Sequence, residues 1–133
     1  MTPTVLDPEL VATRNHPWGA TFTFQGEGVD EAIFRAQVRA YPGAPGFPLI
    51  AFNMTAVENV TGIRTVSTKG SGATTEITVE VFAARAQIDA LPRIGPRGDD
   101  QCLAWELDVA LGDDRWEPWL TSPFRLREGV VRV

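Results

Sequence analysis

Apolar and polar residues alternate one by one over several short stretches of this chain. In the clearest stretch, residues 34–40, Phe34, Ala36 and Val38 alternate with long polar side chains. Because successive side chains of a β-strand point to opposite faces, this pattern predicts a strand with one buried and one solvated face. The same period of two recurs over residues 21–25, 76–81, 103–109, 124–127 and 131–133.

Segments rich in glycine and proline separate these stretches. Residues 42–46 and 69–72 are the two most prominent, and glycine and proline at this density favour turns and cannot continue a central strand. We expect tight hairpins at residues 26–28 and 112–114. Weaker strands are predicted over residues 49–52, 62–66 and 116–120, where Pro118 places the last strand at a sheet edge or a bulge.

Two segments have helical character. Asp7, Pro8 and Glu9 are the residue types that begin helices. This segment ends at residues 15–17, so a short helical turn and an extended strand over residues 10–13 are equally compatible with it. Residues 83–91 are rich in alanine and are followed by Pro92, which predicts one or two helical turns between two strands.

The elements together predict an all-β fold. Seven or eight short strands, turns at intervals of about 8–12 residues and one short helical crossover are typical of an antiparallel β-sandwich. A chain of 133 residues fits one domain. We assign residues 18–133 to the sandwich, and residues 1–17 to an N-terminal arm or a first edge strand.

Charge and composition exclude several classes of partner and cofactor. The chain has 12 basic and 17 acidic residues and a net charge of −5, which argues against nucleic acid as a partner. One cysteine and one histidine exclude thiolate and multi-histidine metal sites within one chain. No apolar run reaches the ~20 residues of a membrane span, and no secretion signal is visible. We expect no cofactor, no metal and no membrane partner.

The chain lacks an evident catalytic constellation. His16 and Cys102 are interpreted as a loop residue and as a structural residue at the start of a strand. Carboxylates are paired at residues 99–100 and 113–114, and Glu106 and Asp108 share one face of a strand. Paired carboxylates can act as acid and base or hold calcium, but no calcium-loop spacing surrounds these pairs. Solvated turn residues are the favoured interpretation, and no enzymatic activity is predicted.

The tryptophans are the remaining candidates for a contact. Trp18, Trp116 and Trp119 lie near predicted strand ends, whereas Trp105 belongs to the alternation of a predicted core strand. Aromatic side chains can stack on sugar rings, and they are also enriched in cores and protein interfaces. We favour the core and interface use, and we retain Trp18, Trp116 and Trp119 as possible contacts to a partner or a glycan.

Several segments follow one another in an order that is similar to a known family. Residues 34–39, Phe-Arg-Ala-Gln-Val-Arg, are similar to its F-x-x-Q-V-R strand, and the other similar segments are residues 13–24, 83–92, 103–109 and 119–132. The family resembled is that of small phage and prophage virion proteins with an immunoglobulin-like β-sandwich, which includes the N-terminal domain of baseplate upper proteins. Ser122-Pro123 replaces a usual glycine, and Trp105 replaces a common tyrosine.

The resemblance implies a structural role without an active site. The leading hypothesis is a non-enzymatic assembly protein of a phage or prophage tail particle. It would act as a docking or spacer module in the virion, or in the host cytoplasm before assembly. Its partners would be other virion proteins or copies of itself in a homo-oligomer, with residues 1–17 or 129–133 in the contact. The alternative is a carbohydrate-binding module that uses exposed tryptophans.

Overall fold

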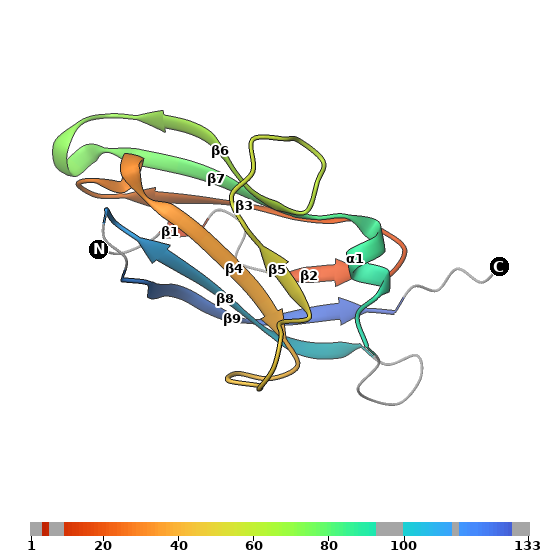
Figure 1. The fold of residues 1–133 in the computed structure, drawn as a ribbon. Helices are drawn as coiled ribbons and strands as arrows, with labels where there is room; N and C mark the ends of the chain where they lie inside the picture. The colour runs from red at the N-terminus through yellow and green to blue at the C-terminus, as the bar shows by residue number, and fades with distance from the viewer. Residues whose placement is uncertain (1–3, 6–9, 93–99, 113–114, 129–133) are drawn as a thin grey trace.

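The computed structural model describes residues 4–5, 10–92, 100–112 and 115–128. These residues form a mostly-β protein with two sheets (Figure 1). The four-stranded sheet has the order β1 (Thr4–Val5), β3 (Trp18–Gln25), β7 (Glu76–Ala83), β6 (Gly62–Lys69). The five-stranded sheet has the order β2 (Val11–Thr13), β9 (Glu117–Arg127), β8 (Gln101–Ala110), β4 (Ile33–Arg39), β5 (Ile50–Phe52).

Short helices stand between some of the strands. The helix α1 (Arg85–Asp89) follows β7 and precedes β8, so it lies where the chain passes from one sheet to the other. This position confirms the helical crossover predicted over residues 83–91. Two 3-10 turns, η1 (Val29–Glu31) and η2 (Gly72–Thr74), precede β4 and β7.

The period-two stretches form the long strands, as predicted. Residues 21–25, 34–40, 76–81 and 103–109 lie largely within β3, β4, β7 and β8. The predicted strands over residues 116–120 and 124–127 are one strand, β9, in which the register against β8 shifts between Leu107 and Asp108, opposite Leu120 and Pro118. Pro118 therefore stands at a bulge, as its missing N–H requires.

The structure also decides between the helical and the extended alternative for the N-terminal segment. Residues 11–13 form the strand β2, so the extended alternative is correct for this segment. Residues 7–9 and the predicted last strand, residues 131–133, lie outside the described residues. Leu10 and Ala12 are buried, and Arg125 N–H donates to the Leu10 carbonyl at 2.9 Å. This part of the predicted arm packs on its own domain.

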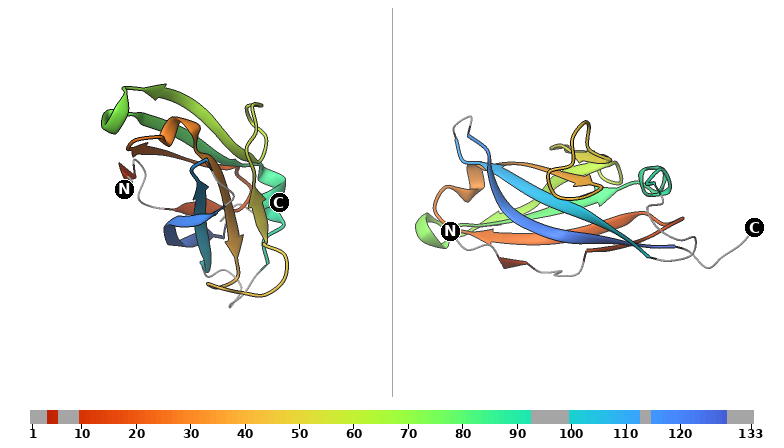
Figure 2. Two further views of the ribbon diagram at one scale, coloured as in Figure 1. Left: turned by 60° about the vertical axis from the view of Figure 1, so that its left-hand side comes forward. Right: turned by 90° about the horizontal axis from the view of Figure 1, so that it is seen from below.

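The antiparallel prediction is wrong for one sheet. β2 pairs with β9 in parallel, with Val11 opposite Arg125 and Thr13 opposite Arg127, so the five-stranded sheet is mixed. Turn signals report only pairings between neighbouring segments, and these two strands are more than 100 residues apart. The sheets are also joined, because Met54 and Ile63 form a parallel bridge between the β5 and β6 sides. Figure 2 shows both sheets curving around a common interior.

Aromatic rings fill the interior between the sheets. Trp105 of β8 stacks on Phe22 of β3, with 5.4 Å between ring centroids, and Phe24 stacks on Phe34 of β4 at 5.6 Å. All four of these side chains are at most 2% exposed. Since each pair joins one sheet to the other, the apolar faces of the alternating strands meet here and form the core.

A buried arginine connects three segments at the α1 end of the molecule. Arg14 Nε donates to Glu128 Oε2 at 2.7 Å, and its Nη1 donates to the carbonyl oxygens of Asp89 and Leu91, each at 3.0 Å. The Arg14 and Glu128 side chains are only 11% and 6% exposed. Arg14 thus fixes the end of β2 to the end of α1 and to the residue after β9.

Replacement of Trp105 by alanine should cost about 3–5 kcal/mol of unfolding free energy, because it removes a buried ring that spans both sheets. Trp105→Phe is the matched control. The indole Nε1 is buried and has no hydrogen-bond partner in the described part of the chain, so phenylalanine keeps the stacking and removes an unsatisfied donor. Chemical denaturation measures both. Equal losses for the two variants would contradict the assigned core.

Gly62 should be intolerant of a side chain. A Cβ at this position would lie 2.7 Å from the Asn53 carbonyl oxygen and 2.8 Å from Thr55 Cγ2. These atoms belong to the junction in which Ile63 N–H donates to Asn53 O and Thr55 N–H donates to Ile63 O, both at 2.9 Å. Gly62→Ala should lower the thermal midpoint. Gly19→Ala, whose Cβ meets its nearest atom at 3.5 Å, should leave the midpoint nearly unchanged.

Candidate functional site

The outer face of the five-stranded sheet carries a row of polar side chains from β4 and β8. Their register places Arg35 opposite Asp108 and Gln37 opposite Glu106. The neighbours of these residues in each strand, including Phe34, Val38 and Leu107, are buried in the core. Strand alternation therefore places the row on the face that points away from the core.

The two arginines of the row are held by specific partners. Arg35 Nε donates to Asp108 Oδ2 at 3.2 Å, and its guanidinium lies over the Trp116 ring, 4.2 Å from the centroid. Arg39 Nε donates to Gln37 Oε1 at 3.2 Å. Arginine suits position 35, because its planar group can stack on an aromatic face and donate in its own plane at once.

The two carboxyl groups of the row, Glu106 and Asp108, stand on the same face of β8. Burial raises the pKa of Glu106 above its ordinary value of 4.5, and the hydrogen bond and negative charge of Asp108 raise it further. Gln37 and Arg35 oppose this shift of the pKa. Asp108 Oδ1 is buried and has no partner among the described residues. A proton on Glu106 would supply the donor that this oxygen lacks.

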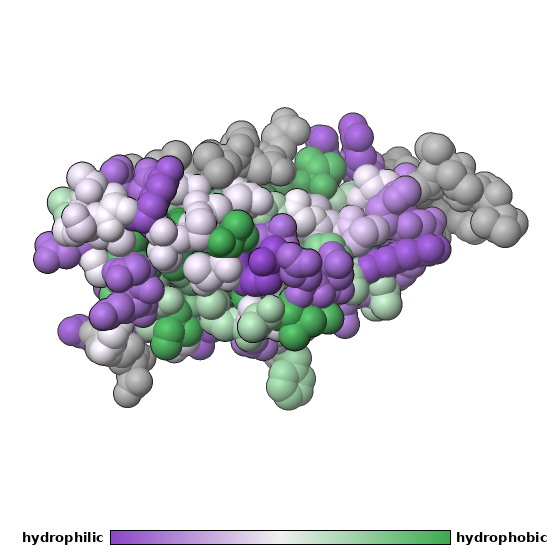
Figure 3. All heavy atoms as spheres, turned by 90° about the horizontal axis from the view of Figure 1, so that it is seen from above, coloured by the Kyte–Doolittle hydropathy of each residue, from purple (hydrophilic) through white to green (hydrophobic). Residues whose placement is uncertain are grey.

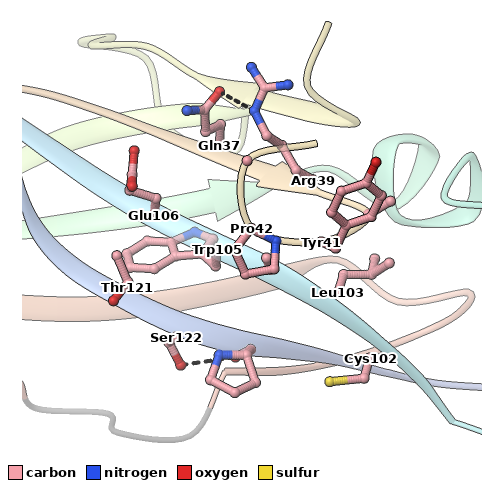
Figure 4. A pocket seen from close by; sticks show the side chains of 14 residues that line it. Gln37, Arg39, Tyr41, Pro42, Cys102, Leu103, Trp105, Glu106, Thr121 and Ser122 are labelled. Carbon is pink, nitrogen blue, oxygen red and sulfur yellow. Dashed lines mark hydrogen bonds between the residues drawn. The ribbon is translucent and has the colours of Figure 1, made fainter. Parts of the chain in front are cut away.

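A groove of about 500 Å³ lies beside this row (Figure 4). β4, β8 and β9 form it together with the start of the β4–β5 loop. Glu106 and Gln37 provide polar groups in the wall, Thr121 of β9 lies at one side, and Tyr41 and Pro42 of the loop lie over the sheet. The groove therefore combines apolar surface with a few polar groups, which is the usual composition of a binding site.

The β4–β5 loop, residues 40–48, contains no charged residue. Arg39 holds its conformation, because Nη1 donates to the carbonyl oxygens of Ala44 at 2.8 Å and Gly46 at 2.7 Å. The loop nevertheless presents large apolar groups to solvent: the exposed fraction is 57% for Tyr41 and 98% for Phe47. The loop therefore presents two large exposed apolar side chains and no charged one.

The three predicted contact tryptophans lie at separate places. Trp18 is only 5% exposed and packs against Phe52 and Phe124 in the core. Trp119 is half-buried and packs against Phe24, near the other end of β3. Trp116 is half-buried beside Arg35. The fold therefore gathers no shared platform from these side chains, and their contact with a partner or a glycan stays a prediction.

The other candidate residues are also dispersed. His16 is exposed in a turn, and the exposed Cys102 lies in the wall of the groove. Asp100 pairs with Arg125 at 3.7 Å, whereas Asp99, Asp113 and Asp114 lie outside the described residues. Within the described ranges, no three metal-ligating side chains form a group, and no helix is long and apolar enough to cross a membrane.

The comparisons with known proteins add no assignment. No protein-family model matches the chain, and no curated protein matches it. The resemblance to phage virion proteins therefore rests on the segments quoted from the sequence.

The groove and the β4–β5 loop beside it do not follow from the sequence pattern. The glycine and proline content of residues 42–46 predicts only a turn. The available signal is the absence of charge across residues 40–48 together with Tyr41 and Phe47. The alternation correctly predicts that Gln37 and Arg39 point outward from a strand. It does not predict which backbone atoms the Arg39 guanidinium contacts.

Glu106→Gln should raise the thermal midpoint at pH 7, and the gain should disappear under acidic conditions. Because the folded-state pKa of Glu106 is raised, its stabilising contribution is complete below the unfolded value and is lost as the pH rises through the folded value. Glutamine keeps a donor for Asp108 at every pH. Thermal melts from pH 4 to pH 8 test this. A gain that is the same at every pH would contradict the raised pKa of Glu106.

Proposed function

We propose that this chain is a non-enzymatic structural and assembly protein of a phage or prophage tail particle, in which it serves as a docking or spacer module. The observation that carries the docking role is the exposure of apolar side chains on the two loops that flank β5. Phe47 and Tyr41 stand on the β4–β5 loop, and Met54, Val57 and Val60 on the β5–β6 loop are 40%, 60% and 41% exposed.

This distribution supports an interface more than a small-molecule enzyme site. The two loops together present five large exposed apolar side chains, and exposed apolar surface rimmed by polar residues often marks a protein interaction site. On the face seen in Figure 3, apolar residues form separate patches between polar ones. Several small apolar anchors surrounded by polar surface are the usual composition of a specific protein interface.

The immunoglobulin-like character of the fold belongs to the same proposal. Its support is the stacking of rings across the two sheets, together with the short helix at a crossover. The parallel β2–β9 pair and the bridge between Met54 and Ile63 would be additions to such a sandwich.

Two observations test this function: the identity of the neighbouring genes, and the presence of the chain in purified particles. We expect tail or capsid genes beside the gene, and we expect the chain to cosediment with particles. A Phe47→Ser, Val57→Ser double variant should fold normally and be depleted from particles. Val66→Ser, which changes an exposed valine of β6 outside the two loops, should be retained. A locus without virion genes, or particles that lack the wild-type chain, would overturn the proposal.

A further inference from the structure

The β4–β5 loop carries an exposed aromatic side chain, Phe47, and also forms part of the wall of the groove. Phe47 projects from the loop with 98% of its surface exposed, so it does not occupy the groove of its own chain. The groove, about 500 Å³, begins at Tyr41, Pro42 and Gly43, only a few residues away in the same loop. One molecule therefore presents an exposed apolar side chain and a largely apolar groove, both formed in part by the same loop.

We propose that two copies of the chain pair about a two-fold axis, so that Phe47 of each copy fills the groove of the other. A two-fold interface uses the same patch on both copies, and this requires the projecting group and the cavity to lie within one patch. Their proximity in the β4–β5 loop meets that requirement. The inference deepens the proposed docking role, but it holds for any function in which this loop is an interface.

The lining of the groove suits an aromatic ring. Tyr41, Pro42 and Pro123 provide apolar surface, and Thr121 contributes a methyl and a hydroxyl group. Arg39 also lines the groove, where its guanidinium is held by donating to Gln37, Ala44 and Gly46. The entering loop brings no charge of its own, so pairing buries no unpaired charge from that loop.

Hydrogen bonds fix the conformation of the β4–β5 loop already in the single chain. Arg39 binds two of its carbonyl oxygens, Ala44 N–H donates to Tyr41 O at 3.0 Å, and Leu49 N–H donates to Val38 O at 2.7 Å. These bonds fix both ends and the middle of the loop. Little conformational entropy is then lost on association, which favours binding by a small surface.

The available area predicts a weak, reversible dimer. A phenylalanine buries about 150–250 Å², so the exchange of two such rings with their grooves lies near the lower end of specific interfaces, below about 1,200 Å². The pair should be detectable only at high protein concentration. In an assembled particle, neighbouring copies meet at high local concentration, and weak pairwise contacts are then sufficient.

Sedimentation of the full chain tests the pairing at concentrations up to about 1 mM. The wild-type chain should change from monomer to dimer and grow no further. Phe47→Ser, which removes the ring, should raise the dissociation constant at least about 30-fold. Thr121→Arg, which places a long side chain in the groove from an exposed strand position, should do the same. Val66→Ser should dimerise normally.

A mixture of the two defective variants gives the sharpest result. The Phe47→Ser copy keeps an intact groove and the Thr121→Arg copy keeps an intact ring, so their mixture restores one of the two ring–groove contacts. The mixture should therefore associate more weakly than the wild-type chain but more strongly than either variant alone. Unchanged thermal midpoints show that both variants are folded. A monomeric wild-type chain, open-ended growth, or a mixture that associates no more strongly than either variant alone would each overturn the pairing. Retention of a monomeric chain in particles would leave the docking role intact and reject only the pairing.

Discussion

The structure depends on the strict alternation of side chains in β4 and β8, which pair with each other through seven consecutive positions from Ile33–Ala110 to Arg39–Ala104. One set of side chains, such as Phe34 and Trp105, forms the core, and the other forms the polar row on the outer face. A shift of register by one residue would turn one of these strands over, and would bring either Arg35 of β4 or Glu106 of β8 into the core. Burial of the core face therefore fixes the register, and the register fixes the positions of the polar side chains on the outer face.

Arg39 connects this sheet to the surface that we propose for docking. It is the last residue of β4, and its guanidinium contacts Gln37 in the strand and two carbonyl oxygens in the loop. The position of the loop therefore follows the position of the strand. The junction at Gly62 has the corresponding role for the β5–β6 loop, because its close contact with Asn53 and Thr55 fixes both ends of that loop.

The sequence predicts many features that depend on neighbouring residues, but the hairpin predicted at residues 26–28 is wrong, because β3 and β4 lie in different sheets. The long strands, the helix after β7 and the irregularity at Pro118 follow from periodicity, alanine content and the missing proline N–H. Features that join distant segments are not encoded locally. The parallel pairing of β2 with β9 and the contacts of Arg14 with Asp89, Leu91 and Glu128 bring together residues far apart in the chain. The groove has the same origin, since three strands and a loop contribute to it.

The apolar residues of this chain serve two purposes: those in the core stabilise the fold, and those on the β4–β5 loop are exposed for association. Trp105 and Phe22 bury their rings within one molecule, and that burial stabilises the fold. Phe47 leaves nearly all of its ring in water, so it contributes almost nothing to folding, and the free energy of removing it from water is still available for association. Because Arg39 binds the loop through backbone atoms, replacement of Phe47 leaves these bonds intact. Binding can therefore be changed at this position without a change of fold.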